Sequence, residues 1–274
     1  MKGSTFCPAK INTFLSVGPP DKTGYHPIRS LFQSISLGDD LTISETDGPD
    51  QLICNIDLGP VENTLTKTLR LLRELLPIPS LRMELTKRIP AESGLGGGSS
   101  DAAGLLRILK ANMKHDLPDI LMDDVALAVG ADVPFFLVGG RAKAEGYGEI
   151  LTPLDDLPTQ HLLIARPEVG VATGPAYRAL DAMDRPWRDF PSDSTELYND
   201  FERVSPCECG ELAERLQIHG ASGALMSGSG SAVFGYFADQ ARAEIAKEKL
   251  LAEGWKNLWL AHTLDRASCI STTS

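Results

Sequence analysis

The sequence predicts a two-domain protein of mixed helices and strands, in the α/β or α+β class. Strand-like and helix-like hydrophobic patterns alternate along the whole chain, and no repeat or low-complexity tract interrupts them. A chain of 274 residues, 42% of them hydrophobic, can bury a large core and has the size at which one domain commonly divides into two. An acidic, proline-bearing stretch at residues 153–158 precedes a new apolar strand. We therefore predict one domain over residues 1–153 and a second over residues 154–274.

Hydrophobic periodicity assigns the elements of the first domain. In residues 9–15, period-two spacing places Lys10 and Asn12 on one face of a strand and apolar side chains on the other. Apolar residues over positions 61–76 recur at helical spacing, which predicts an amphipathic helix whose apolar face belongs to the core. Alternation over residues 81–86 predicts another strand.

The second domain shows the same alternation of patterns. An order of strands and helices like this suits a small sheet with helices on one face. The predicted strands cover residues 162–165, 223–226, 232–237 and 258–261, and the predicted helices cover residues 174–183, 210–219 and 240–253.

The most informative motif is the glycine-rich segment at residues 90–103, which joins the strand at 81–86 directly to a helix rich in Ala and Leu. Its glycines let consecutive backbone N–H groups face one concavity, and the first turn of the helix adds partial positive charge. The segment therefore predicts a phosphate-binding loop made of Pro90, Gly94, Leu95, Gly96, Gly97, Gly98, Ser99 and Ser100.

Two familiar phosphate loops are excluded. The P-loop pattern needs a lysine where this chain has Gly98, and the dinucleotide-binding pattern needs a glycine where it has Ser99. A flexible glycine linker is the plain alternative, but the direct passage from strand to helix argues against it.

Asp132 is a single carboxylate inside the apolar run at residues 125–138. An ionised carboxylate buried without a partner would cost several kcal/mol, so we expect a cation or a bound ligand beside it, or a raised pKa. Lys10 is the best candidate partner. An equally open alternative makes Asp132 a helix-end or turn residue after Gly130.

Small residues at positions 227–231 read Ser-Gly-Ser-Gly-Ser between two predicted strands. Such a turn is often only a hairpin. It could equally give a second backbone surface, including Gly228 and Ser229, that closes over phosphate or substrate from the other domain. The sequence does not separate these alternatives.

Charge, hydropathy and cysteine content indicate which partners, location and metal sites this protein can have. Lys and Arg number 26 against 37 Asp and Glu, and the net charge of -11 opposes nucleic acid or an anionic membrane as a partner. No apolar run has the length of a membrane span, and the first residues lack a secretion signal, so we expect a cytoplasmic protein. The five cysteines are odd in number and without a CxxC pair, which favours free thiols over a metal site at Cys207 and Cys209.

Five segments together resemble the GHMP kinase superfamily in order and spacing over nearly the whole chain; they are residues 8–12, 24–26, 94–103, 130–134 and 227–231. The resemblance implies a two-domain α+β fold. Its N-terminal domain would be an α/β unit like the second domain of ribosomal protein S5, and its C-terminal domain would be ferredoxin-like. The triplet Gly24-Tyr25-His26 and residues 146–151 resemble the members that phosphorylate a cytidine-diphosphate-linked polyol in the non-mevalonate route to isoprenoid precursors.

The resemblance implies roles for the residues singled out above. ATP would lay its phosphates across residues 94–100, with Mg²⁺ held either by the nucleotide alone or by the nucleotide together with Ser100. Asp132 would accept the proton of the substrate hydroxyl, and Lys10 would keep Asp132 ionised and stabilise charge on the attacking oxygen. Asn12 would position the polyol.

Recognition of the cytosine is also implied. Tyr25 would stack on the base, His26 would read its hydrogen-bonding edge, and Tyr177 would supply a second ring. In the plainer alternative, Tyr25 and His26 occupy an exposed turn and Tyr177 belongs to an amphipathic helix face. Glu92 departs from the smaller, uncharged residues of many relatives and puts an acid beside the phosphate loop.

Three rival functions keep most of these features. Another GHMP kinase, of the homoserine or mevalonate type, would have no use for a Tyr-His pair. A lyase of the diphosphomevalonate decarboxylase type shares the fold, and a protein that only binds ATP would not need both Lys10 and Asp132. The residues that contact adenine are not fixed by any motif, and an acidic chain is compatible with a monomer or a homodimer.

Overall fold

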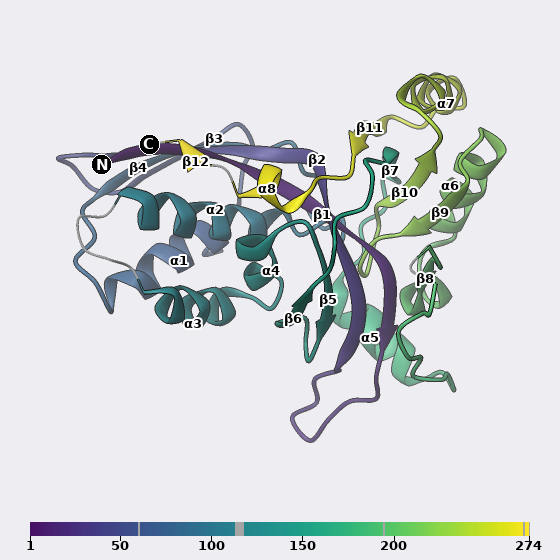
Figure 1. Ribbon diagram of the computed structural model, residues 1–274, viewed down its shortest axis with the longest axis horizontal. Helices are drawn as coiled ribbons and strands as arrows, with labels where there is room; N and C mark the ends of the chain where they lie inside the picture. The colour runs from purple at the N-terminus through teal and green to yellow at the C-terminus, as the bar shows by residue number, and fades with distance from the viewer. Residues whose placement is uncertain (60, 113–117, 194, 271, 274) are drawn as a thin grey trace.

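A computed structural model describes residues 1–59, 61–112, 118–193, 195–270 and 272–273 and shows two sheets with their helices (Figure 1). The first sheet has eight strands within these residues, and its main order is β12-β1-β2-β4-β3. Beside this path, β5 pairs with β2, β6 pairs with β5, and the short strand β8 pairs with β1. The strands are β1 (Lys2–Val17), β2 (Ile28–Glu45), β3 (Gln51–Cys54), β4 (Leu81–Thr86), β5 (Arg141–Glu145), β6 (Ile150–Pro153), β8 (Tyr198–Asn199) and β12 (Thr272–Thr273).

Four helices pack below this sheet in the view of Figure 1. They are α1 (Thr64–Arg73), α2 (Gly97–Asn112), α3 (Asp119–Val129) and α4 (Val133–Val138). The central one, α2, contacts β1, α1 and α4, and it is buried at every position from Ser100 to Leu109. The buried part of the helix therefore starts at Ser100, directly after its glycine-rich first residues.

The second sheet has four antiparallel strands in the order β11-β7-β10-β9. These are β7 (His161–Arg166), β9 (Gly223–Met226), β10 (Val233–Phe237) and β11 (Asn257–His262). The helices α6 (Cys207–Ile218) and α7 (Gln240–Ala252) pack on it, while α5 (Thr173–Asp181) lies against the 3₁₀ helix η1 (Asp200–Arg203).

The long hairpin of β1 and β2 links the two units. It crosses from the first sheet toward the second in Figure 1. The backbone N–H of Leu264 donates to the carbonyl of Ser34 at 2.9 Å, and β1 carries an irregularity between Asn12 and Phe14. The chain returns to the first sheet twice, at β8 and at β12. The short helix α8 (Arg266–Cys269) comes just before β12 in the sequence. The domain boundary after residue 153 stays a prediction.

Most elements lie where the periodicity predicts them. The strands at 81–86 and 223–226 coincide with β4 and β9. The helix predicted over 61–76 is shorter, because Asn63 accepts a hydrogen bond from the N–H of Thr66 at 3.0 Å and caps α1. Val61 precedes the helix and is exposed, so its predicted place in the core is wrong.

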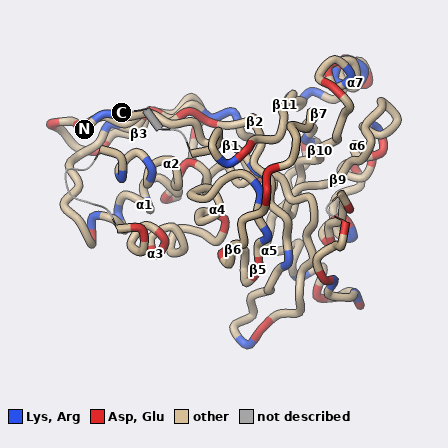
Figure 2. The backbone as a smooth tube through the Cα atoms, in the orientation of Figure 1, with Lys and Arg blue, Asp and Glu red and all other residues tan. Residues whose placement is uncertain are grey.

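Acidic and basic positions are interspersed along both units (Figure 2). None of the helices within the described ranges is both long and apolar enough to cross a membrane. All five cysteines are free thiols, as the sequence predicts. Within the described part of the chain, no cluster of three His, Cys, Asp or Glu side chains could hold a metal ion, and this includes Cys207 and Cys209.

Candidate active site

The glycine segment forms a tight loop between β4 and α2. Gly94 and Gly96 both adopt a φ of 74°, a region that side chains rarely enter. A Cβ at Gly94 would overlap the carbonyl oxygen of Ser227, and one at Gly96 would lie 2.7 Å from the ring of Phe136. The loop therefore needs glycine for its backbone angles and for its close packing.

A cavity of about 450 Å³ opens on the side of the loop that faces α1; we call it the loop cavity. Six of the eight predicted phosphate-binding residues line it, namely Pro90, Gly94, Gly96, Gly97, Gly98 and Ser99. The N–H groups that begin α2 have no partner within the helix and point to this end.

The other two predicted residues are placed differently. Ser100 is fully buried, and its hydroxyl donates to the carbonyl of Pro8 at 2.7 Å. This placement argues against the expected contact between the Ser100 hydroxyl and Mg²⁺. Leu95 is also fully buried, and its carbonyl accepts from the N–H of Lys10 at 3.0 Å. Both residues thus anchor the loop to β1.

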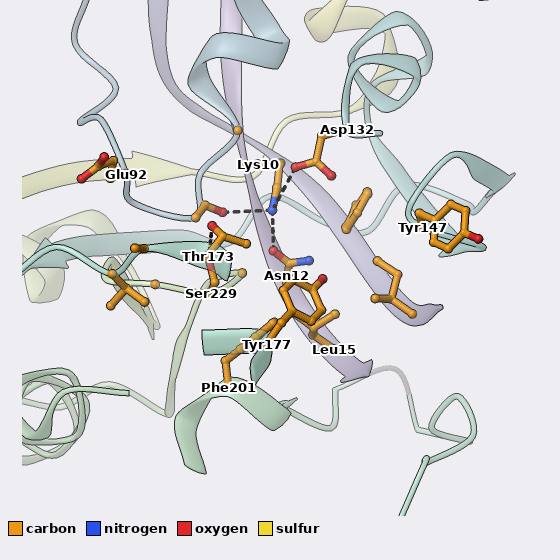
Figure 3. A pocket seen from close by; sticks show the side chains of 18 residues that line it. Lys10, Asn12, Leu15, Glu92, Asp132, Tyr147, Thr173, Tyr177, Phe201 and Ser229 are labelled. Atoms are coloured by element: carbon orange, nitrogen blue, oxygen red, sulfur yellow. Dashed lines mark hydrogen bonds and ion pairs between the residues drawn. The ribbon is translucent and has the colours of Figure 1, made fainter. Parts of the chain in front are cut away.

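A second cavity of about 460 Å³ also has the glycine loop as part of its wall (Figure 3); we call it the acceptor cavity. Lys10, Asn12 and Asp132 line it together with residues of α5 and the turn after β9. Glu92, Gly94 and Gly96 line both cavities, which therefore meet at the glycine loop.

Lys10 lines the acceptor cavity and contacts the glycine loop. Its ammonium donates to Asn12 Oδ1 at 2.6 Å and to the carbonyl of Gly94 at 2.9 Å, and it lies 3.6 Å from Asp132 Oδ2 (Figure 3). Burial lowers the pKa of Lys10, while the negative charge of Asp132 opposes that shift. The lysine is thus a fixed charge in a dry site.

Asp132 occupies the residue before α4 and makes no capping hydrogen bond there. Its carboxylate is partly open to the acceptor cavity and forms the ion pair with Lys10. Of the two alternatives that the sequence leaves open, the geometry therefore agrees with a paired carboxylate. The predicted apolar burial is only partial, since the side chain is 32% exposed.

Asn12 holds Lys10 in place. Its Oδ1 accepts from the lysine, and its Nδ2 donates to Ser30 Oγ at 2.8 Å, which in turn donates to the carbonyl of Phe14 at 2.6 Å. Both ends of the amide are therefore fixed before any substrate arrives.

Ser227 belongs to the segment at 227–231 that the sequence singles out, but it is not among the predicted substrate-binding residues. Its hydroxyl is fully buried, donates to the carbonyl of Gly94 at 3.0 Å and accepts from the N–H of Asn12 at 3.3 Å. The turn after β9 is therefore both a strand connection and a surface against the glycine loop. Gly228 and Ser229 line the acceptor cavity, and Ser229 Oγ lies 3.1 Å from Thr173 Oγ1.

The aromatic residues only partly agree with the sequence predictions. Tyr177 lines the acceptor cavity, and burial together with the charge of Asp132 raises the pKa of its hydroxyl to about 12. The ring of His26 stacks on Tyr177 with centroids 4.9 Å apart. His26 Nδ1 lies 3.0 Å from the carbonyl of Gly18, and Nε2 lies 3.5 Å from Asp181. These contacts argue against a free imidazole edge for reading a base.

Tyr25 lies at the rim of the site. It is 67% exposed, and its ring centroid is 5.7 Å from that of Tyr147, which lines the acceptor cavity. Neither Tyr25 nor His26 is among the described residues that line the cavity. Tyr147 was not singled out, although it lies inside the Gly-Tyr-Gly segment of residues 146–148.

Glu92 lines both cavities, and Figure 3 shows it at the far side of the acceptor cavity from Asp132. Its φ of 50° is unusual for a residue with a side chain. The acid noted in the sequence therefore lines the loop cavity together with the predicted phosphate-binding residues.

Comparison with known proteins identifies this arrangement. The model of the GHMP kinase N-terminal domain matches residues 63–140, and that of the GHMP kinase C-terminal domain matches residues 179–257. A homoserine kinase from Cytophaga hutchinsonii superposes with a TM-score of 0.68 over 96% of this chain and 95% of its own, and at 19% identity this likeness shows the fold alone. The chain is a GHMP kinase with the expected two-domain α+β fold.

Closer relatives define the branch. The 4-diphosphocytidyl-2-C-methyl-D-erythritol kinase of Geobacter sulfurreducens is 35% identical, with 90% of this chain and 94% of the relative covered. That of an Anaeromyxobacter species is 38% identical, with 92% and 88% covered. A crystal structure of 4-(cytidine 5'-diphospho)-2C-methyl-D-erythritol kinase matches with a TM-score of 0.80 and 34% identity over 95% and 98% of the two chains. The chain belongs to the family of 4-diphosphocytidyl-2-C-methyl-D-erythritol kinases.

Proposed function

We propose that this kinase transfers the γ-phosphoryl group of ATP to the 2-hydroxyl of 4-diphosphocytidyl-2-C-methyl-D-erythritol, which yields the 2-phosphate and ADP. The observation that carries the mechanism is the ion pair of Lys10 and Asp132 in the acceptor cavity, where Lys10 also donates to the carbonyl of Gly94, a residue that lines both cavities. A hydroxyl bound in one cavity could there approach a phosphoryl group bound in the other. The reaction would serve the non-mevalonate route to isopentenyl diphosphate.

The loop cavity suits the phosphates of ATP. The glycines in its wall carry no side chains, so phosphate groups can approach the backbone closely, and the N–H groups at the start of α2 favour negative charge. Mg²⁺ would neutralise the phosphate oxygens during transfer. Because the described residues hold no cluster of three ligands, the ion would be bound mainly by the nucleotide, with Ser99 as a loop residue that lines the cavity and carries a hydroxyl.

Asp132 is the proposed base. It accepts the hydroxyl proton as the new oxygen–phosphorus bond forms and the bond between phosphorus and the β,γ-bridging oxygen breaks. Lys10 keeps the carboxylate ionised and stabilises charge on the attacking oxygen, because its ammonium is fixed by three contacts and shielded from water. Asn12 fixes the ammonium and faces the polyol.

For the cytidine end, we propose an aromatic site formed by Tyr25 and Tyr147 at the rim and by Tyr177 inside. The exposed fractions of Tyr25 and Tyr147, 67% and 42%, leave ring surface for a base. Stacking on an aromatic side chain contributes about 1–3 kcal/mol per base. Gly228 and Ser229 would meet the substrate from the other side of the acceptor cavity.

A cytoplasmic location and a monomeric or homodimeric state are part of the proposal. Five free thiols suit a reducing compartment, which supports the location.

The test compares phosphoryl acceptors at saturating ATP. Substrates are 4-diphosphocytidyl-2-C-methyl-D-erythritol and the same polyol phosphate without cytidine, and the enzymes are wild type, Asp132→Asn and Tyr25→Ala. Wild type should phosphorylate only the first compound, Asp132→Asn should lower kcat by about 10²- to 10⁴-fold, and Tyr25→Ala should raise KM about 5- to 150-fold, the equivalent of about 1–3 kcal/mol. Equal turnover of both acceptors would refute the base site, and an unchanged kcat in Asp132→Asn would refute the proposed base.

A further inference from the structure

A third cavity lies at the junction of the two units, apart from the active site. Its volume is about 310 Å³, and its walls come from β1, β2, β5, β9 and β10 together with the connecting segments. No described residue that lines it also lines the loop cavity or the acceptor cavity. Thr13 belongs to this third cavity while its neighbour Asn12 belongs to the acceptor cavity, so the cavities open on opposite faces of β1.

Arg141 on β5 is the one charged residue among the described residues that line this cavity. It is only 7% exposed. Within the part of the chain that the structure describes, its guanidinium makes no hydrogen bond and no ion pair, although its backbone carbonyl accepts from Arg266.

This lack of a partner separates Arg141 from the other charged residues that are buried to the same degree. Lys10 pairs with Asp132, Arg107 donates to the carbonyl of Phe136 at 2.6 Å, and Asp200 pairs with Arg185 at 3.3 Å. Asp39 and Asp101 share the ammonium of Lys87. Burying a charge without a partner is unfavourable, so a guanidinium left open to a cavity indicates an anion that is still to bind.

The rest of the cavity wall specifies the chemistry of that anion. Tyr236 lines the same cavity as Arg141. Tyr236 and Thr13 are thus further donors for an oxyanion. The side-chain amide of Gln33 donates to the carbonyls of Ser34 and Leu264, both at 2.9 Å. Its side-chain oxygen can therefore accept a hydrogen bond from a ligand hydroxyl.

We propose that this cavity is a second ligand site, for a small hydroxylated molecule that carries one oxyanion group. The planar fork of Arg141 binds two oxygens of a phosphate or carboxylate, Tyr236 and Thr13 donate to the same group, and Gln33 accepts from a hydroxyl of the ligand body. The volume of about 310 Å³ admits a short polyol phosphate. This site does not depend on the proposed kinase mechanism.

Calorimetric titration tests the proposal on the full chain, in buffer free of other oxyanions and with a non-hydrolysable ATP analogue saturating the glycine loop. The probes are glycerol 2-phosphate, glycerate and inorganic phosphate. The first two separate a phosphate ligand from a carboxylate ligand, and inorganic phosphate shows how much of the affinity comes from the polyol part of the ligand. We expect one site on wild type for one of the two organic anions, with affinity at least 10-fold lower for Arg141→Gln and several-fold lower for Tyr236→Phe. Arg242→Gln removes the same charge from the exposed face of α7 and should bind like wild type.

Thermal unfolding supplies a second readout that a purely structural arginine would not give. Without oxyanions, Arg141→Met should melt at or above the temperature of wild type, because it removes an unpaired buried charge. The bound probe should raise the melting temperature of wild type but not of the variant. The proposal is overturned if wild type binds none of the probes, if Arg141→Gln binds them equally well, or if Arg141→Met melts lower than wild type without oxyanions.

Discussion

Lys10 shows how one buried side chain can organise a phosphoryl-transfer site. Its ammonium touches the side chain of Asn12, the backbone of the glycine loop and the carboxylate of Asp132. Moving any one of these would leave a buried charge underpaired, which makes the geometry stiff. The ion pair therefore fixes the distance between the proposed base and the phosphate loop.

Asp132→Asn should reduce kcat by about 10²- to 10⁴-fold, because the amide keeps the shape but cannot take the hydroxyl proton. The affinity for an ATP analogue should hardly change, since Asp132 does not line the loop cavity. Steady-state rates and nucleotide titration measure the two quantities. A loss of nucleotide affinity with unchanged kcat would contradict the assigned role.

The pH profile of kcat should report Lys10. Burial lowers its pKa from the ordinary 10.5, so the ammonium loses its proton at a lower pH than a free lysine would. We expect kcat to fall on the alkaline side, with a midpoint below 10.5. Lys10→Arg, whose guanidinium stays charged, should lose this alkaline limb even if its kcat is low. An identical limb in the variant would assign it to another group.

At the scale of elements, the glycine loop depends on a buried charge cluster beneath it. Lys87 pairs with Asp39 on β2 and lies 2.7 Å from Asp101 Oδ2 on α2. Asp39 Oδ1 also accepts from the backbone N–H of Ile89 at 2.8 Å, just before the loop begins. One cluster thus ties together the strand, the start of the loop and the helix that follows it.

Asp101 should make the stability of the protein depend on pH. Burial raises its pKa from 3.8 to about 8, although Lys87 opposes the shift. The folded state therefore holds a proton that the unfolded state releases, and this contribution to stability fades as the pH rises from about 4 to about 8. We therefore expect the urea concentration at the unfolding midpoint to decline for wild type as the pH rises from about 5 to about 9. The midpoint of Asp101→Asn should change less. Parallel declines would exclude Asp101 as the source.

The loop should tolerate no side chain at Gly94. In Gly94→Ala, the added methyl group would overlap the carbonyl oxygen of Ser227, and the alanine would have to adopt a φ of 74°. We therefore expect a loss of stability of about 2 kcal/mol or more, together with weaker ATP binding. Gly210→Ala is the matched control, because its methyl group lies in open space on α6 and should stabilise by about 0.5–1 kcal/mol. Thermal melts of both variants measure the difference. Equal melting temperatures would show that the loop can relax.

At the scale of the whole molecule, the active site exists only where the two units touch. The first unit supplies Lys10, Asp132 and the glycine loop, and the second supplies Tyr177 and the turn from Ser227 to Gly230. The buried hydroxyl of Ser227 is the direct link, since it bonds to Asn12 on β1 and to Gly94 in the loop.

Ser227→Ala should loosen this link without emptying the core. Leaving the N–H of Asn12 and the carbonyl of Gly94 without that partner should cost about 1–3 kcal/mol of stability. We also expect lower kcat with both substrates saturating, because Lys10 and the loop lose their common support. Chemical denaturation and steady-state kinetics measure these changes, and Ser205→Ala, at an exposed serine hydroxyl, is the control. Unchanged kcat would mean that the other contacts are sufficient.

The sequence by itself determined the alternating elements, the glycine loop before α2 and the shared face of Lys10 and Asn12, because period, glycine content and strand alternation are local properties. It also carried the motifs by which the family was recognised. Only the tertiary structure decided that Asp132 pairs with Lys10, that Ser100 turns into the core, that His26 stacks on Tyr177, and that Ser227 joins the two units. These contacts join residues far apart in the chain, and the partner of a buried polar group depends on which elements pack together. The same reason explains why Arg141, unremarkable in the sequence, has no side-chain partner among the described residues and lines a cavity.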